Sequence, residues 1–504
     1  AIGQDLSDLV VNDLTINGEL QALGTIKLDG NYPTGTDNVA LGNEALDSGS
    51  LSGGNNTAIG DNSLSANTSG ANNVAVGQAA LCTNLTGGSN VAVGRCALKL
   101  NTASNNVAVG YHSMCTTSSG TENTAIGMSS LKSNTTADQN TALGNQTLCK
   151  NTTGANNTSV GACSLEANTT GASNTSVGFE SLKSNTTSAG NSALGYEALQ
   201  DNTTGGVNTA VGYRALRDNT TAGSNVAVGS CSLITNTTGT CNTAVGTNAL
   251  LANTTAIGNT AVGMYSLDAN TEGFNNTAVG NCSGSGITTG DCNTFVGAFA
   301  AYTATTGDNN TAVGDQALSL TTTASDNTAV GRSSLKANTT GATNASVGAC
   351  SLRDNTTGSS NVAVGSESLR LNTTAGSNTA VGGRSLFSST TGECNVAIGN
   401  NAMKRTTTGH SNTAVGTLAL CANTTGTVNQ AFGRVSLCAN TTASCNSAFG
   451  YYTLQANTTG ECNTAIGNSS LAANTTASGN VAVGAYALLK NTTGTRNTAI
   501  GSCA

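Results

Sequence analysis

The 504-residue chain lacks most of the residue types from which globular proteins build their cores. It has one proline, no tryptophan and 3% aromatic residues, so a core of bulky side chains is excluded. Charged residues make up 9%, against about 25% in ordinary soluble domains. The net charge is −8 and there is no basic run, which argues against nucleic-acid binding. No run of about 18 apolar residues occurs, so we expect no transmembrane helix.

Residue patterns typical of catalytic or metal-binding sites are also scarce. There are two histidines, His112 and His410, and no CxxC pair, so a zinc site is not expected. No nucleophile lies beside a base, no paired carboxylates recur at a fixed spacing, and the aspartate ladders of calcium-binding repeats are missing. We therefore expect neither an enzyme nor a cofactor. The first residues show no basic segment followed by an apolar one, so no signal peptide is expected either.

What the sequence does contain is one short repeat, N-T-A-V-G. We count 28 copies between Asn38 and Gly501. The closing glycines follow at intervals of 18, 17, 17 and 16 residues from Gly42 to Gly110, and at intervals of 17 from there to Gly501. A fixed short period indicates a solenoid, in which chain length sets only the number of coils.

Two regions follow from this period. Residues 38–504 are predicted to form a β-solenoid of 28 coils. Residues 1–37 carry alternating apolar residues and the turn signals Asn17-Gly18 and Asp29-Gly30, which predict a short β stalk or cap. The repeats run to within three residues of the C-terminus, so we expect a capping or C-terminal domain to have been removed.

Each coil is described here by positions counted from its closing glycine. Position 13 is asparagine in all copies, position 14 is mainly Thr or Val, position 15 is Ala in 24 of 28, and position 16 is always Val, Ile, Leu or Phe. These residues favour a strand whose Asn and Ala face one way and whose neighbours face the other. We expect the asparagines to form a structural ladder and the glycines to provide a φ > 0 turn or a close approach. The ladder includes Asn56, Asn123, Asn208, Asn310, Asn412 and Asn497, and the coil-closing glycines include Gly60, Gly110, Gly212, Gly314, Gly416 and Gly501.

The strand carries no charge on either face in any copy, which predicts that both faces are covered. Ordering 17 residues costs roughly 17–34 kcal/mol, while the few apolar side chains of a coil return roughly 1.5–3 kcal/mol each. One coil therefore cannot fold alone. We expect the Ala face to pack against sister chains, most simply in a parallel homotrimer.

All 16 cysteines lie at positions 2, 5 and 12 of the coil. This confinement predicts disulfides, within or between chains, and an oxidising extracellular setting. The alternative is that cysteine replaces a small apolar residue at half-buried sites. The pairing stays open. The candidates are Cys82, Cys96, Cys149, Cys163, Cys231, Cys241, Cys282, Cys292, Cys421, Cys438, Cys445 and Cys462.

Eighteen coils carry an N-x-S/T sequence at position 7, among them Asn134, Asn151, Asn202, Asn355 and Asn457. Such sequences are possible N-glycosylation sites. Turn formation explains Asn-Thr-Thr-Gly equally well, and coils only about 4.8 Å apart leave little room for a glycan on each.

The repeats N-T-A-V-G and N-V-A-V-G, over residues 38–504, resemble the N-S-V-A-I-G-type repeats in the heads of trimeric autotransporter adhesins. They are also similar to related repeats in tail or surface fibres of phages and large viruses. The resemblance implies a left-handed parallel β-roll, three chains around one axis, and a role in attachment. Residues 11–30 resemble the stalk repeats of viral fibres. The coil here is longer than in those heads, and cysteine is unusual in them.

The leading hypothesis is therefore the structural rod of an extracellular or virion-surface fibre or filament with an adhesin-like role. Its expected partners are copies of itself, in a homotrimer and end to end in a filament, and a host-surface receptor or glycan. The alternative is an ice-binding or other lattice- or glycan-binding solenoid, because regular threonine columns can match a lattice. A polysaccharide-lyase type of enzyme lacks its carboxylate or basic cluster here.

Overall fold

The computed structural model describes residues 36–504, so the predicted stalk or cap lies outside the described residues except for its last two. Within the described chain the fold is all β and contains no helix. It is a parallel β-solenoid with one three-residue strand in each coil, 28 strands in all. The strands are β1 Val39–Leu41, β2 Thr57–Ile59, β3 Val74–Val76, β4 Val91–Val93, β5 Val107–Val109, β6 Thr124–Ile126, β7 Thr141–Leu143, β8 Thr158–Val160, β9 Thr175–Val177, β10 Ser192–Leu194, β11 Thr209–Val211, β12 Val226–Val228, β13 Thr243–Val245, β14 Thr260–Val262, β15 Thr277–Val279, β16 Thr294–Val296, β17 Thr311–Val313, β18 Thr328–Val330, β19 Ala345–Val347, β20 Val362–Val364, β21 Thr379–Val381, β22 Val396–Ile398, β23 Thr413–Val415, β24 Gln430–Phe432, β25 Ser447–Phe449, β26 Thr464–Ile466, β27 Val481–Val483 and β28 Thr498–Ile500.

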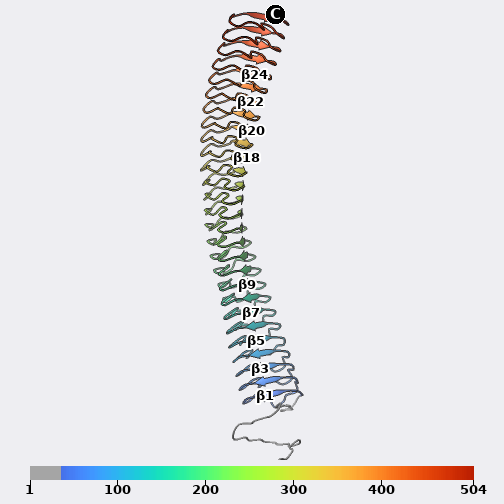
Figure 1. Cartoon of the computed structure of the whole chain (residues 1–504). Helices are drawn as coiled ribbons and strands as arrows, with labels where there is room; N and C mark the ends of the chain where they lie inside the picture. The colour runs from blue at the N-terminus through green and yellow to red at the C-terminus, as the bar shows by residue number, and fades with distance from the viewer. Residues whose placement is uncertain (1–35) are drawn as a thin grey trace, which may run out of the picture.

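Each strand pairs in parallel with the strand of the next coil, and like positions face each other. Thr311 of β17 pairs with Thr328 of β18, and Ala312 with Ala329. The coils stack into a single long rod, with the strands in one column along it (Figure 1). With about 4.8 Å between neighbouring strands, 28 coils make a rod of roughly 130 Å.

One face of each strand points into its own coil, and this finding corrects one prediction. Ala at position 15 and Asn at position 13 are buried, as Ala312 and Asn327 show with 0% exposure. Thr or Val at position 14 and Val, Ile or Leu at position 16 point outward and are half-buried or exposed. The expectation that sister chains cover the Ala face was wrong, because the leucine of the same coil already covers it. The face left open is the one with positions 14 and 16.

The core of each coil depends on a leucine in an unusual backbone conformation. Leucine at position 4 is fully buried in most coils, for example Leu131 and Leu216. Its φ is positive in both, 46° and 54°. This region costs a non-glycine residue roughly 1–2 kcal/mol. The conformation is held by hydrogen bonds to the neighbouring coil, as where the Leu131 N–H donates to the Thr147 carbonyl at 3.0 Å. The half of the coil that follows the closing glycine therefore consists of successive turns, with the position 4 leucine buried inside.

The closing glycines combine both features expected of them. Gly314 has φ +131°, and a Cβ built on it would lie 2.7–2.8 Å from backbone atoms of Gly331 in the next coil. Gly60, Gly110, Gly212 and Gly416 have φ between +128° and +138° and the same close approach to the following glycine. No other residue fits this column.

The least regular coils are repacked internally. Phe295 takes an alanine position and is fully buried, the only phenylalanine in the core of the described residues. Room for its ring comes from Gly284 and Ala301, which stand at two leucine positions. A Cβ on Gly284 would lie 2.8 Å from the Phe295 ring. The large-for-small exchange is thus compensated by two small-for-large exchanges.

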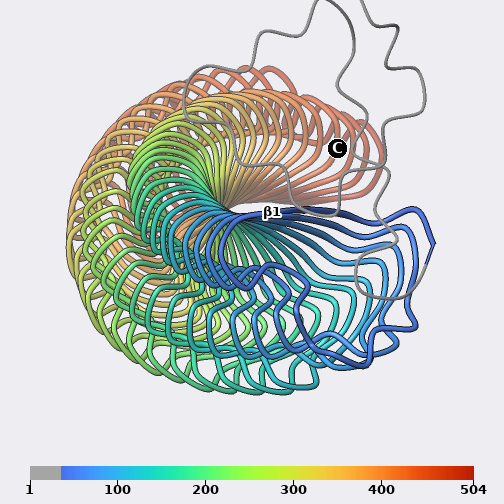
Figure 2. The same cartoon turned by 90° about the horizontal axis from the view of Figure 1, so that it is seen from below.

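The rod is wound about an axis that runs beside its strand column. Seen along its length, the coils converge on a common centre near β1, and their outer loops fan round it (Figure 2). In the side view the strands stay in a nearly straight column while the loops pass from one side to the other (Figure 1). The strand column is therefore the innermost part of the winding.

Candidate functional surfaces

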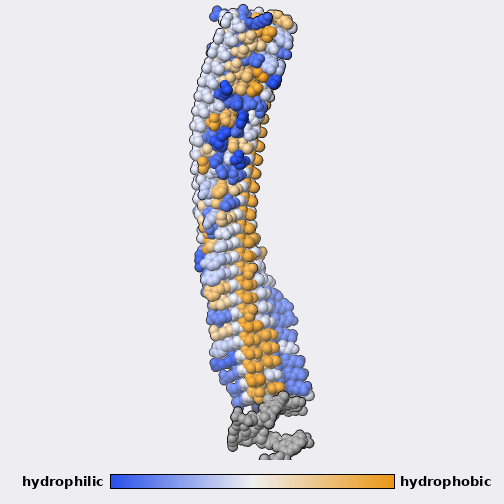
Figure 3. Space-filling model, in the orientation of Figure 1, coloured by the Kyte–Doolittle hydropathy of each residue, from blue (hydrophilic) through white to orange (hydrophobic). Residues whose placement is uncertain are grey.

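The most continuous surface feature is a column of apolar side chains at position 16, which we call the apolar stripe. All 28 of its residues are Val, Ile, Leu or Phe, from Leu41 to Ile500. Leu143, Leu194 and Ile398 are 45%, 51% and 40% exposed. The space-filling view shows the stripe running along the strand column for most of the rod (Figure 3). Soluble monomers seldom expose a contiguous apolar surface of this extent.

Aromatic residues widen the stripe in places. They stand at position 1, directly after the closing glycine and beside position 16. The rings of Phe179, Tyr196 and Tyr213 stack in successive coils, with centroids 5.4 and 5.5 Å apart. All three are more than 40% exposed. These rings enlarge the apolar surface next to the winding axis.

The asparagines of position 13 form a continuous ladder inside the rod. The backbone N–H and the Nδ2 of Asn123 both donate to Oδ1 of Asn106 in the preceding coil, at 3.0 and 3.2 Å. The Nδ2 also donates to the Ala137 carbonyl of the following coil at 2.9 Å. The same bond recurs along the ladder, where the backbone N–H of each asparagine donates to Oδ1 of the asparagine one coil earlier. It measures 2.8–3.0 Å at Asn56, Asn208, Asn310, Asn412 and Asn497. The ladder satisfies buried polar groups and leaves none free for catalysis.

A second asparagine ladder, at position 7, was missed in the sequence and bears on glycosylation. Asn134, Asn151, Asn202, Asn355 and Asn457 are all 0% exposed. Nδ2 of Asn151 donates to the Gly154 carbonyl at 2.9 Å and to Oδ1 of Asn134 at 3.3 Å. A glycan on Nδ2 would remove both bonds and has no room inside the coil. N-glycosylation at these residues is incompatible with this packing, and turn and ladder formation account for the N-T-T-G sequence.

The second ladder has gaps, and two of them leave an acceptor without a donor. Where Ile287 and Ser389 replace asparagine, the buried Oδ1 atoms of Asn270 and Asn372 one coil earlier have no hydrogen-bond partner. In most coils the next asparagine supplies that donor, as Asn372 does for Asn355 at 2.7 Å. The hydrogen bonds of this ladder therefore join each coil to the next.

The cysteines are all free thiols, so the prediction of disulfides within the chain was wrong in this structure. None of the 16 is paired: Cys82, Cys96, Cys149, Cys163, Cys231, Cys241, Cys282, Cys292, Cys421, Cys438, Cys445 and Cys462 all stand as half-buried or exposed thiols, with four others. Most lie in coils whose neighbours carry no cysteine at the same position. Two pairs are exceptions: Cys421 and Cys438 occupy position 5 of adjacent coils, and Cys445 and Cys462 occupy position 12 of adjacent coils. The Cys438 thiol stabilises a thiolate on Cys421 and lowers the pKa of Cys421 to about 7.

Charges are sorted between the two sides of the coil. We call positions 1 to 6 the return face, and it carries both signs. The cations of residues 36–504 lie on it with one exception, Arg496. They are Arg95, Lys99, Lys132, Lys150, Lys183, Arg214, Arg217, Arg332, Lys336, Arg353, Arg370, Arg384, Lys404, Arg405, Arg434 and Lys490. Burial together with Lys132, Arg95 and Lys99 lowers the pKa of His112 on this face.

The turn that leads into the strand, at positions 11 and 12, carries acids instead. We call these residues the strand-side acids: Asp37, Glu122, Asp138, Asp291, Asp308, Asp326, Glu393 and Glu461. Six ion pairs within 4.0 Å occur in residues 36–504, and all of them join residues of the return face. Along the part of the chain that the structure describes, no strand-side acid has a cation partner.

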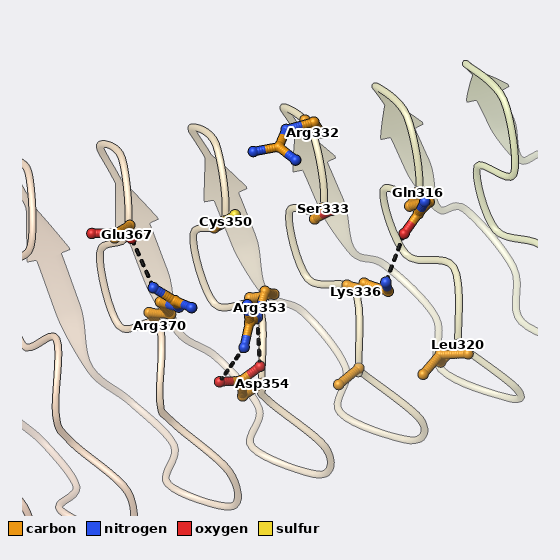
Figure 4. A pocket seen from close by; sticks show the side chains of 11 residues that line it. Gln316, Leu320, Arg332, Ser333, Lys336, Cys350, Arg353, Asp354, Glu367 and Arg370 are labelled. Carbon is orange, nitrogen blue, oxygen red and sulfur yellow. Dashed lines mark hydrogen bonds and ion pairs between the residues drawn. The ribbon is translucent and has the colours of Figure 1, made fainter.

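The return face is hollowed in one of its cation-rich stretches. A hollow of about 600 Å³ spans four coils between Gln316 and Arg370 (Figure 4). Arg353 pairs with Asp354 at 2.7 Å, and Arg370 pairs with Glu367. Lys336 donates to Oε1 of Gln316 at 2.6 Å and, like Arg332, has no carboxylate partner among the described residues. The lining of the hollow carries four cations, Arg332, Lys336, Arg353 and Arg370, against two carboxylates, Asp354 and Glu367, so its net positive charge favours anions.

Comparisons with known proteins do not assign the chain. No protein-family model matches it, and a search of curated proteins finds no significant match. Among residues 36–504 no cluster of three or more His, Cys, Asp or Glu could hold a metal ion. In the same part of the chain, no helix is long and apolar enough to cross a membrane.

Proposed function

We propose that the protein is the rod of an extracellular or virion-surface fibre, built from three parallel chains. It acts through length, stiffness and multivalent presentation, with an adhesin-like role in attachment. The observation that carries the proposal is the unbroken apolar stripe beside the winding axis. Three chains wound about that axis would turn their stripes toward one another.

The energetics of the stripe favour association. Each half-exposed Val, Ile or Leu that becomes buried contributes on the order of 1 kcal/mol. Over 28 levels in each chain the sum reaches tens of kcal/mol, well above the 4–15 kcal/mol that association costs. The proposed trimer thus keeps the expected symmetry but uses the Val column, where the sequence had suggested the Ala column.

The trimer is tested by charging the stripe. Val228, Val245 and Val262 are each replaced by aspartate, and static light scattering measures the mass. The wild type should show three times the 49.4 kDa of one chain, and the variant should fall to a single chain. The matched control replaces Thr221, Thr238 and Thr255, exposed in the outer turn of the same three coils, by aspartate, and should stay trimeric. A wild-type protein that is a stable monomer at all concentrations would refute the proposal.

The alternative of an ice-binding or other lattice-binding solenoid is separable by experiment. The threonine hydroxyls at position 8 form hydrogen bonds within the rod, as where Oγ1 of Thr152 donates to the Thr169 carbonyl at 3.0 Å. Those at position 9, such as Thr153, are exposed in a regular column. Thermal hysteresis at high protein concentration would support the alternative, and its absence would remove it.

A further inference from the structure

We infer that neighbouring chains of the fibre meet with unlike faces, the strand-side acids of one chain lying against the return-face cations of the next. This inference rests on the proposed trimer and adds which surfaces meet and in which register. The partner is a second copy of this chain, parallel and at the same height.

The first argument is the shape of the coil. Each coil is a flat loop with the strand on one long side and the return face on the other (Figure 4). The two sides join at the closing glycine, next to the winding axis (Figure 2). Three such loops arranged as spokes about that axis place the strand side of each beside the return face of the next.

The second argument is unpaired charge. Within residues 36–504 none of the eight strand-side acids reaches a cation within 4.0 Å. Ten of the sixteen return-face cations likewise have no carboxylate within that distance, among them Lys132, Lys150, Lys336 and Lys404. Some of these groups form hydrogen bonds with neutral partners, as Asp138 does with the Thr121 N–H, but they have no partner of opposite charge. A single chain therefore has acids without a cation partner on one side and cations without a carboxylate partner on the other, and contact between chains would pair them.

The third argument is that acids and cations lie at the same level along the rod. In a parallel assembly whose chains are related by rotation alone, the same strand of every chain lies at the same level along the axis. Glu122 and Lys132 flank the same strand, β6, and Asp138 and Lys150 flank β7. Asp326 and Lys336 flank β18, and Lys336 also lines the hollow described above.

A fourth level repeats the arrangement at β22, which Glu393 precedes and Lys404 and Arg405 follow. The levels of the other four strand-side acids carry no return-face cation. The matched levels at β6, β7, β18 and β22 thus recur along much of the rod and would fix its register.

Contact between unlike faces also explains why the number of chains would be three and not two. A two-fold dimer joins like surface to like surface, which would set acids against acids. A head-to-tail contact closes only by cyclic rotation, which suits a ring of spokes around one axis.

The test uses full-length chains with charges reversed at the four matched levels. A return-face variant carries Lys132→Glu, Lys150→Glu, Lys336→Glu and Lys404→Glu. A strand-side variant carries Glu122→Lys, Asp138→Lys, Asp326→Lys and Glu393→Lys, and a third variant carries all eight changes. Circular dichroism confirms the fold, and sedimentation at low and high salt measures trimer dissociation.

We expect each four-residue variant to dissociate about tenfold or more readily than the wild type at low salt, and the eight-residue variant to recover. A control with Thr136, Thr153, Thr340 and Thr408 replaced by lysine in the outer turn should behave as wild type. If all variants remain equally stable trimers, the unlike-face contact is overturned while the trimer stands. If the wild type is itself a monomer, the proposed function fails and this inference with it.

Discussion

At the scale of single residues, the structure separates what the sequence pattern could and could not predict. The asparagine and glycine columns were predictable, because ladder formation and positive φ are properties of those side chains. The left-handed leucines were not. Nothing in Leu131 or Leu216 favours φ near 50°, and only the hydrogen bonds of the stacked coils impose it. That conformation turns the leucine inward onto Ala, which is why the choice of open face was wrong.

One thiol is predicted to stand out in reactivity. The S–H of Cys438 donates to the Cys421 sulfur, and Lys404 and Arg405 add positive charge, so the pKa of Cys421 falls to about 7. At pH 7 about half of Cys421 is thiolate, against about 1% of a thiol of pKa 9. Because a less basic thiolate is also a weaker nucleophile, we expect iodoacetamide to alkylate Cys421 roughly fivefold to tenfold faster than exposed thiols. Peptide mass spectrometry over time gives the rates.

The pH dependence and one substitution check the cause. Alkylation of Cys421 should reach half of its maximal rate near pH 7, whereas that of a thiol with the ordinary pKa of about 8.5 should still be accelerating above pH 8. Cys438→Ala should remove the difference. Equal rates at Cys421 in both proteins would show that the neighbouring thiol has no effect. Disulfides between chains stay a prediction, which the same spectra would test in unreduced protein.

At the scale of the coil, the interior is polar in a way that composition alone did not reveal. Two asparagine ladders run beside the alanines and leucines, and both are fully buried along most of the rod. The position 13 ladder was expected, since it lies in the repeated pentapeptide. The position 7 ladder was not, because N-T-T-G is also an ordinary turn sequence and its burial depends on how the return face folds.

A gap in the position 7 ladder offers a stabilising substitution. Ser389→Asn should supply the missing donor to the Asn372 Oδ1 and shorten the 3.4 Å bond that Ser389 Oγ already donates to the Gly392 carbonyl, in the geometry that Asn355 and Asn457 show. Because one bond is added, the coil should gain about 0.5–1.5 kcal/mol. Amide hydrogen exchange of residues 372–410 measures the gain locally.

The neighbouring Ser388, half-buried on the return face, provides the control. Ser388→Asn adds the same side chain outside the core and should leave exchange within ±0.5 kcal/mol of the wild type. Faster exchange in Ser389→Asn than in the wild type would mean that the ladder does not hold the coil together.

At the scale of the whole molecule, fold class and period were predictable from the sequence, whereas winding and charge sorting were not. The 17-residue spacing and the strand-forming residues are enough to predict a parallel solenoid. Which side of the coil lies nearest the winding axis depends on small rotations between successive coils, which add up along the rod (Figure 2). The sorting of charge becomes visible only when each position is assigned to a side of the coil.

The stacking predicts that whole coils can be removed. Deleting residues 213–348 joins Gly212 to Ala349 and preserves the spacing between glycines. The shortened chain should fold and lose roughly 38 Å of length, because eight coils at about 4.8 Å each are gone. Electron microscopy of negatively stained rods measures the length. A deletion of residues 213–340, which leaves eight residues out of register, should disrupt the rod at the junction.

The uniform stacking of each coil on the next has a consequence for how the chain reaches its native state. Pairing partners such as Thr311 and Thr328 are 17 residues apart, so the relative contact order of a 504-residue chain is only about 0.03. No segment has to wait for a distant one to be synthesised. A nascent chain can wind up coil by coil as it leaves the ribosome, each finished coil serving as the template for its successor.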